Sequence, residues 1–158
     1  MATTQHRLPG AAAPEFIEPE LATLVDKAPE GDAWFHEIKF DGYRIGCRLE
    51  GGIATLLTRG GLDWTDRFPH IADELELLKR RDAYLDGEVV ALNAKGISDF
   101  GGLQDALSSH RKLRAEPVYY VFDLLQLGNM DLRRAPLRER KARLPEVLGV
   151  KKMPPRAL

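Results

Sequence analysis

Two short runs of alternating residues meet at Asp41-Gly42, and this pattern constrains the fold more than any other in the sequence. The runs occupy residues 34–40 and 43–49. Because successive side chains of a strand point to opposite faces, each run predicts a β-strand with one mostly apolar face. The pair Asp41-Gly42 predicts a tight turn between the two strands. The polar face of the first strand would present Lys39.

A hairpin turn and a third strand follow. Glu50-Gly51-Gly52 predicts the turn, because glycine adopts positive φ without strain. Residues 53–58 form the next predicted strand, which completes an antiparallel meander. Ahead of this meander, residues 14–29 hold a few apolar side chains between prolines, and we expect an extended segment that lies across the domain.

Two later strands are predicted at 84–92 and 118–125, and both carry carboxylates. The second is the most apolar run of the chain, which predicts a central position in the sheet. Asp86, Glu88 and Asp123 interrupt these runs. A buried carboxylate is costly without a partner, so we expect a cation, a ribose hydroxyl or a metal beside them.

Three helices are predicted to begin at Pro69, Phe100 and Pro136. Asp99 is the expected N-cap of the second helix. The third helix is basic: Lys141 falls on its apolar side, whereas Arg138 and Arg140 are expected to be exposed. Pro145 is expected to end or kink this helix.

The length suits one domain, and the composition excludes several classes of protein. We divide the 158 residues into a flexible tail at 1–14, a domain at 15–148 and a basic tail at 149–158. The formal net charge of -1 gives no argument for nucleic acid beyond a local patch. The single cysteine, Cys47, excludes an intrachain disulfide, predicts a reducing compartment and argues against zinc. No apolar run reaches membrane-spanning length and no signal peptide is expected, so no membrane partner is predicted.

The polar residues together predict chemistry on a nucleotide. A neutral amine from Lys39 could attack phosphorus if desolvation or nearby cations favour its uncharged form. Cations would spread over the phosphates, a carboxylate would fix the ribose or a metal, and an aromatic ring would hold the base. From the residues alone, Lys39 can also be the solvated lysine of an edge strand, and Phe122 can be a core residue.

Four motifs support one specific resemblance. In order along the chain they are Glu37-x-Lys39-x-Asp41-Gly42-x-Arg44, Thr58-Arg59-Gly60-Gly61, Asp86-Gly87-Glu88 and Val121-Phe122-Asp123. This series resembles the adenylation domain of ATP-dependent DNA ligases, and most closely the ligase domain of bacterial end-joining ligases. The resemblance implies an α+β fold with antiparallel sheets flanked by helices, an ATP-grasp-like nucleotidyltransferase fold that is incomplete and lacks the OB-fold domain.

The same resemblance assigns the residues that handle the base and the covalent step. It implies that Lys39 becomes covalently linked to AMP from ATP, with Mg²⁺ as a further cofactor whose ligands are not assigned. Glu37 and Ile38 would read the edge of adenine. Phe122 would stack on the adenine ring.

The remaining roles concern ribose, phosphates and DNA. By the resemblance, Glu88 binds the ribose hydroxyl, and Arg44 and Arg59 contact the ribose and phosphates. Arg59 would also contact the 5′-phosphate of nicked or broken double-stranded DNA, unless it is a loop arginine that pairs with Asp63 or Asp66. The implied setting is DNA repair in the bacterial cytoplasm at the nucleoid, with other end-joining proteins as partners.

The match stops before the C-terminal part of such ligases. Their next Glu-Gly strand motif, their Lys-x-Lys strand and their OB-fold domain have no counterpart before Leu158. We therefore expect a partial adenylation domain that holds nucleotide weakly and self-adenylates slowly or not at all. Two alternatives stay open: an RNA ligase or capping-type nucleotidyltransferase, and a non-catalytic fragment that binds nucleotide or DNA through the basic stretch 133–143.

Overall fold

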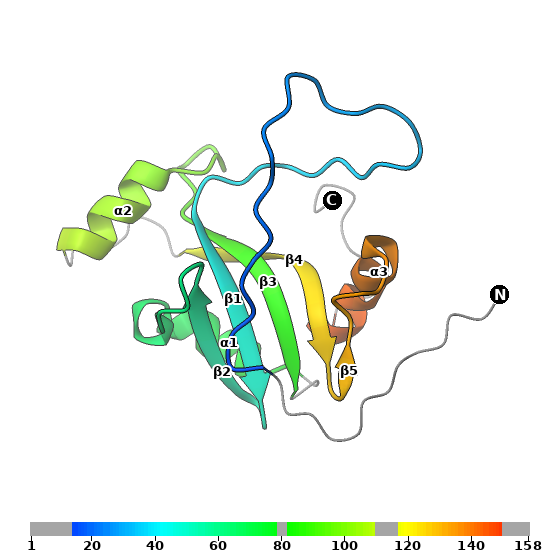
Figure 1. Ribbon diagram of the computed structural model, residues 1–158. Coiled ribbons are helices and arrows are strands. Elements are labelled where there is room, and N and C mark those ends of the chain that lie inside the picture. The colour runs from blue at the N-terminus through cyan, green and yellow to red at the C-terminus, as the bar shows by residue number, and fades with distance from the viewer. Residues whose placement is uncertain (1–13, 79–81, 110–116, 150–158) are drawn as a thin grey trace.

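The computed structural model describes residues 14–78, 82–109 and 117–149, in which one antiparallel sheet is flanked by helices (Figure 1). The strands of this part are β1 (Tyr43–Glu50), β2 (Ile53–Thr58), β3 (Ala83–Val90), β4 (Val118–Leu127) and β5 (Met130–Asp131). The helices are the short 3-10 helix η1 (Thr65–Arg67), α1 (Pro69–Glu76), α2 (Phe100–Ser109) and α3 (Leu137–Leu148). The predicted tails at 1–14 and 149–158 lie outside the described residues, apart from Pro14 and Gly149.

The strands follow the order β2-β1-β3-β4-β5, with antiparallel pairing throughout. The predicted strands at 43–49, 53–58, 84–92 and 118–125 are confirmed as β1 to β4, with small changes at their ends. The hairpin between β1 and β2 is confirmed as well, because Gly51 and Gly52 have φ values of 58° and 85°. The strand predicted to be central, β4, is instead second from the edge, and β3 holds the middle position.

One face of the sheet forms the hydrophobic core. Alternate residues of β1, including Ile45 and Cys47, are fully buried there, together with Leu85 and Val89 of β3. Helix α1 covers this face and adds Ile71 and Leu75 to the same cluster. Burying one side chain of this size contributes roughly 1.5–3 kcal/mol. Burial also raises the pKa of the Cys47 thiol to about 12, as expected for a core cysteine.

The strand predicted at 34–40 is not formed, and β1 begins only at Tyr43. No described strand pairs with this segment, and an extended backbone without a partner has no ladder of hydrogen bonds. Its expected apolar face is not buried either, since Trp34 is 57% exposed and Ile38 is 56% exposed. The prediction of a strand from the alternating pattern is therefore wrong for residues 34–40, and Lys39 lies on an irregular segment.

The segment that precedes residues 34–40 crosses the face of the sheet that points away from the core (Figure 1). This agrees with the prediction of an extended segment across the domain. The Ile17 N–H donates to the Tyr84 hydroxyl at 3.1 Å. Tyr84 belongs to β3 and lies opposite Arg48 of β1, on the face that points away from the core. The N-terminal segment is thereby attached to the face that carries the polar residues of β1 and β3.

Helix α3 continues through the proline that was expected to end or kink it. Pro145 lies inside the helix, which runs to Leu148 and ends at Gly149, with φ of 69°. Leu144 and Val147 flank the proline and are both fully buried, so packing against the core holds the last turn in place. None of the helices in the described part has the length and apolar character needed to cross a bilayer.

Candidate active site

The face of the sheet opposite the core carries a row of polar and aromatic side chains, which we call the site face. It is formed by Arg44, Asp86, Glu88, Tyr120 and Phe122. Arg44 of β1 lies directly opposite Glu88 of β3, and Glu88 lies opposite Tyr120 of β4. Because directly opposed residues of an antiparallel pair share a face, the register alone brings these three side chains together.

Arg44 and Asp86 form a two-point ion pair at the centre of this face. The guanidinium donates through Nε and Nη2 to the two carboxylate oxygens, and both distances are 2.6 Å. The Asp86 side chain is only 8% exposed. Burial is the largest single effect and lowers the pKa of Arg44, but the hydrogen bonds to Asp86 and the charges of Asp86 and Glu88 together outweigh it and raise the pKa. The buried carboxylate therefore has the cationic partner that its position requires.

Glu88 links the Lys39 segment to the same group of charges. The Gly42 N–H donates to Glu88 Oε1 at 3.1 Å. Burial raises the pKa of the Glu88 carboxyl above its usual value, and the charges of Arg44 and Lys39 and the Gly42 hydrogen bond oppose that rise. The hydrogen bond from Gly42 thus attaches the end of the Lys39 segment to the site face.

The Lys39 side chain itself is exposed. Desolvation was one of the two conditions named for a neutral amine, and protein atoms of the described part do not supply it.

Phe122 is neither a core residue nor a freely exposed one. Asp86 pairs with Asp123, and Gly87 pairs with Val121, which leaves Phe122 as an extra residue in a β-bulge. Bulges re-aim a side chain within a strand. The Phe122 ring is half-buried, and the guanidinium carbon of Arg44 lies 4.5 Å from its centre.

A second aromatic contact fixes the chain just after Lys39. Phe40 stacks on Tyr120 of β4, with ring centres 4.2 Å apart and planes inclined by 15°. Phe40 was expected to face the core with Trp34, and it packs on the site face instead. Tyr120 had no predicted role, yet its pairing with Glu88 places it on the site face.

Helix α3 contacts the site face and the Lys39 segment through basic side chains that had no predicted role in the nucleotide site. The Lys141 ammonium donates to the Phe122 carbonyl at 2.7 Å and forms an ion pair with Glu37. One turn earlier, the Arg138 guanidinium lies 4.8 Å from the centre of the Phe35 ring. The apolar position of Lys141, between leucines at helical spacing, was the signal in the sequence that this lysine points inward.

Arg140 pairs with the third carboxylate of the predicted strands. Its Nε and Nη2 donate to Asp123 at 2.8 and 2.9 Å, and its Nη1 donates to the Ala135 carbonyl. Asp123 also accepts the N–H of Leu124 at 2.8 Å, so it does satisfy a neighbouring backbone donor. The prediction that Arg140 is exposed is wrong, because its side chain is largely enclosed by these partners.

Besides Lys39, two predicted residues make no contact with the others in the described part of the chain. Ile38 is largely exposed. Arg59 is exposed in the turn after β2, just past the pairing of Thr58 with Ile45, so its backbone comes at the same end of the sheet as Arg44. Arg59 therefore borders the site face without a contact to it.

The described residues do not present a built metal centre. Among them, no three side chains of histidine, cysteine, aspartate or glutamate come together as a group that could hold a metal ion. Asp86 is occupied by Arg44 through both oxygens, and Glu88 accepts from Gly42. The carboxylates that the sequence offered to a metal therefore have protein partners.

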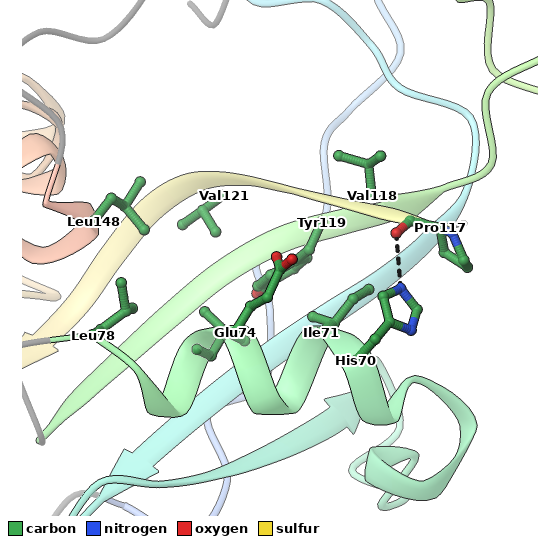
Figure 2. A pocket seen from close by; sticks show the side chains of 10 residues that line it. His70, Ile71, Glu74, Leu78, Pro117, Val118, Tyr119, Val121 and Leu148 are labelled. Atoms are coloured by element: carbon green, nitrogen blue, oxygen red, sulfur yellow. Dashed lines mark hydrogen bonds between the residues drawn. The ribbon is translucent and has the colours of Figure 1, made fainter. Parts of the chain in front are cut away.

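A cavity of about 350 Å³ lies on the other side of the sheet (Figure 2). It runs between α1 and the first half of β4, with Leu148 of α3 at one end. Ile71 and Tyr119 line its wall, and the His70 ring nitrogen Nε2 is hydrogen-bonded to the Pro117 carbonyl at 3.1 Å. None of the predicted site residues lines this cavity, which is separated from the site face by the sheet itself.

Comparison with known sequences points to a single family. The family model described as the ATP dependent DNA ligase domain matches residues 18–156. The chain is 46% identical over 136 residues to the multifunctional non-homologous end joining protein LigD of Pseudomonas aeruginosa, a match that covers 85% of this chain and 16% of that protein. It is 34% identical over 148 residues to DNA ligase C1 of Mycolicibacterium smegmatis, covering 86% of this chain and 42% of the relative.

Comparison with solved structures agrees with the sequences. The ligase domain of LigD from Mycobacterium tuberculosis superposes with a TM-score of 0.59 at 26% identity, over 75% of this chain and 41% of that one. A mycobacterial DNA ligase D complexed with ATP and MES gives the same TM-score and identity over 71% of this chain and 36% of that one. The chain thus spans less than half the length of each relative described here.

Proposed function

Because the chain belongs to the ATP-dependent DNA ligase domain family, as part of a nucleotidyltransferase adenylation domain, we propose that its site face binds ATP and that Lys39 accepts AMP. The observation that supports this proposal is that Arg44, Glu88 and Phe122 share one face of the sheet, to which Gly42, three residues after Lys39, is hydrogen-bonded. These residues come from three separate parts of the chain. A mycobacterial ligase in the same structural class was solved with ATP bound.

The base would be held between a ring and a polar edge. A purine packs well on an aromatic face, and the half-buried ring of Phe122 is the aromatic group beside Arg44. Glu37 is held next to the Phe122 carbonyl by their shared partner Lys141. A carboxylate there can accept from the amino group of adenine, while the backbone of Ile38 offers the neighbouring polar groups.

The sugar and phosphates would lie toward β1 and β3. Glu88 is placed to accept from a ribose hydroxyl, with Arg44 beside it as a donor to ribose or phosphate. Lys39 would lie above the α-phosphate. As the ammonium gives a proton to solvent water, its nitrogen attacks the α-phosphorus, a P–N bond forms, the bond to the bridging oxygen breaks, and pyrophosphate leaves with the electron pair.

Mg²⁺ would arrive with the nucleotide rather than be stored by the protein. Magnesium in nucleotide sites is usually held by substrate phosphates and water with one or two carboxylates. Among the described residues, no group of three or more histidine, cysteine, aspartate or glutamate side chains could hold the ion by itself. We therefore assign the ion to the phosphates of ATP.

We further propose that the acceptor of AMP is the 5′-phosphate of nicked or broken double-stranded DNA. Arg59 supports this, because it is exposed at the end of the sheet that carries Arg44. The relatives are named as end joining proteins and DNA ligases, which favours DNA over RNA as the substrate and repair of breaks in the bacterial cytoplasm as the setting. Other end-joining proteins are the partners that this setting implies.

A purely DNA-binding fragment is the less supported alternative. It relied on the basic stretch 133–143, but several cations of that stretch have partners within the chain. Arg140 binds Asp123, Lys141 binds Glu37, Arg133 binds Asp131 and Arg138 lies over Phe35. Cations that are already paired contribute little to a counterion-releasing DNA surface.

The test uses the 158-residue chain with ATP and Mg²⁺. Isothermal titration calorimetry measures ATP binding, and intact-mass spectrometry measures the covalent AMP adduct over time. We expect saturable binding that weakens at least about tenfold in Glu88→Ala, because the ribose contact is lost. Any adduct should be absent in Lys39→Ala, while ATP binding persists in that variant.

Glu18→Ala, at an exposed position outside the site face, is the matched control and should bind as the unchanged chain does. Absence of ATP binding by the unchanged chain would refute the proposal. Binding that is equal in the Glu88→Ala variant would also refute it, because the ligand would then occupy another place.

A further inference from the structure

Lys141 is a buried charge at the junction of three segments. It is 7% exposed, although it lies on a helix whose other basic residues are nearer the surface. Its ammonium donates to the Phe122 carbonyl of β4 at 2.7 Å and forms an ion pair with Glu37 Oε1. A buried ammonium is costly unless it is paired and hydrogen-bonded, and here both conditions are met.

The two partners of Lys141 belong to the two sides of the proposed base site. Phe122 carries the ring on which adenine would stack, and Glu37 carries the carboxylate that would read its edge. The segment that bears Glu37 forms no ladder with any described strand, so side-chain contacts must set its distance from β4. The Lys141 contacts bridge directly from β4 to this segment.

We propose that Lys141 is a positioning residue that fixes the Glu37 carboxylate relative to the Phe122 ring, and thereby sets the preference of the site for adenine over guanine. This inference rests on the proposed function. Lys141 does not touch the reacting atoms. It acts through Glu37, which lies two residues before Lys39.

The chemistry of the two purines explains why the position of Glu37 matters. The ion pair uses Glu37 Oε1, which leaves Oε2 as a fixed acceptor. Adenine offers an amino group to such an acceptor, whereas guanine places a carbonyl oxygen at the same point of its ring. Two oxygens that both carry negative charge repel, and the penalty is large only when the carboxylate cannot rotate away. Lys141 supplies that restraint.

A second contact from the same helix supports the assignment. Arg138 lies over the Phe35 ring at 4.8 Å, one turn before Lys141. Phe35 and Glu37 are alternate residues of the same segment, so α3 holds this segment at two neighbouring points. The stacking of Phe40 on Tyr120 attaches the far side of Lys39 to β4. Lys39 therefore lies between two attachments, of which Lys141 provides the buried one.

The principal test is Lys141→Met, which keeps the length of the side chain and removes its charge. Calorimetry with ATP and with GTP measures the preference of the site. We expect ATP affinity to fall about tenfold and GTP affinity to change little, so that the ratio of the two affinities falls by about the same factor. A merely structural role would weaken both nucleotides equally.

Limited proteolysis with trypsin tests the restraint without any nucleotide. Cleavage after Lys39 requires the segment to leave β4, whereas Lys27 lies in an exposed part of the same chain and serves as the internal standard. In Lys141→Met, cleavage after Lys39 should accelerate at least about fivefold relative to cleavage after Lys27. Arg134→Met, at an exposed position before α3, should change neither readout.

Glu37→Gln provides a second variant if Lys141→Met fails to fold. It leaves Lys141 with the Phe122 carbonyl, and it should lower the ATP-to-GTP ratio and accelerate cleavage after Lys39 in the same direction. An unchanged ratio in a folded variant overturns the inference, as does unchanged cleavage after Lys39. If the unchanged chain binds neither nucleotide, the proposed function fails, while the trypsin comparison still decides whether Lys141 restrains the segment.

Discussion

The guanidinium carbon of Arg44 lies 4.5 Å from the centre of the Phe122 ring. The same guanidinium binds both oxygens of Asp86, so the cation is fixed in position by one partner and laid over an aromatic ring by the other. Such an arrangement combines a charge-assisted pair with a cation–π contact. The Phe122 ring and the Arg44 cation are therefore held side by side. A nucleotide needs such a pair, with an aromatic ring for its base and a cation for its phosphates.

Replacement of Phe122 by leucine should weaken ATP binding by about tenfold or more. Stacking of a base on an aromatic side chain is worth about 1–3 kcal/mol, and leucine preserves apolar volume without a ring face. Calorimetry on Phe122→Leu and Phe122→Trp measures the effect. The tryptophan variant should retain binding, because it offers a larger ring. Equal affinities for the leucine and tryptophan variants would show that the base does not stack here.

Loss of Arg44 should destabilise the fold as well as the site. Arg44→Met leaves the Asp86 carboxylate buried without its cation, and breaking a buried pair in this way costs about 3 kcal/mol. Urea denaturation measures the free energy of unfolding. Arg133→Met is the matched control, because its pair with Asp131 is half-exposed and should contribute less than about 1 kcal/mol. A similar change in both variants would contradict the burial argument.

Gly42 should tolerate no side chain. A Cβ atom at this position would lie 2.1 Å from the backbone oxygen of Val89, and a backbone atom cannot move aside as a flexible side chain can. Gly42→Ala should lower the free energy of unfolding by about 2 kcal/mol or more and displace the N–H that Glu88 accepts. Gly60→Ala is the control, because a Cβ atom there would have no described atom within 4 Å. Urea denaturation of that variant should give a value within about 0.5 kcal/mol of the unchanged chain.

The Glu88 carboxyl should make a contribution to the free energy of unfolding that decreases as pH rises. Burial raises the pKa of its carboxyl in the folded state, so the folded protein holds this proton more firmly than the unfolded chain does. The contribution is complete below the unfolded value, near 4.5, and is lost as pH rises through the higher folded value. In Glu88→Gln this contribution disappears.

Denaturation at about pH 5 and about pH 7 measures this difference. The decrease in unfolding free energy between the two pH values should be larger in the unchanged chain than in Glu88→Gln. Glu18→Gln, at an exposed position, should behave as the unchanged chain does. A steeper decrease in Glu88→Gln than in the unchanged chain would reverse the sign of the argument.

The strands were predictable from sequence where their alternation coincides with pairing. In β1 and β2 the period of two, the glycine turn and the buried residues all agree, and the prediction is confirmed. Residues 34–40 show equal alternation, yet no described strand pairs with them. A strand depends on a partner that lies elsewhere in the chain, and a local pattern does not contain that information.

The candidate site was predictable as a set of residue types but not as a set of contacts. The sequence required a partner for the carboxylates of β3 and β4, whether a cation, a ribose hydroxyl or a metal, and the structure supplies Arg44 for Asp86 and Arg140 for Asp123. Which cation serves which carboxylate follows from strand register and from the position of α3. The pairing of Lys141 with Glu37 joins distant parts of the chain and leaves no periodic signal in the sequence.

Cys47 lies fully buried in the strand that carries Arg44, and it is the only sulfur nucleophile of the sequence. A thiol-labelling reagent can reach it only after β1 has separated from its neighbours. The rate at which Cys47 is labelled therefore measures how often the sheet opens, and no probe has to be introduced into the chain. The rate of trypsin cleavage after Lys39 measures the release of the segment that carries Lys39. Together, the two rates would distinguish local release of this segment from unfolding of the sheet beneath it.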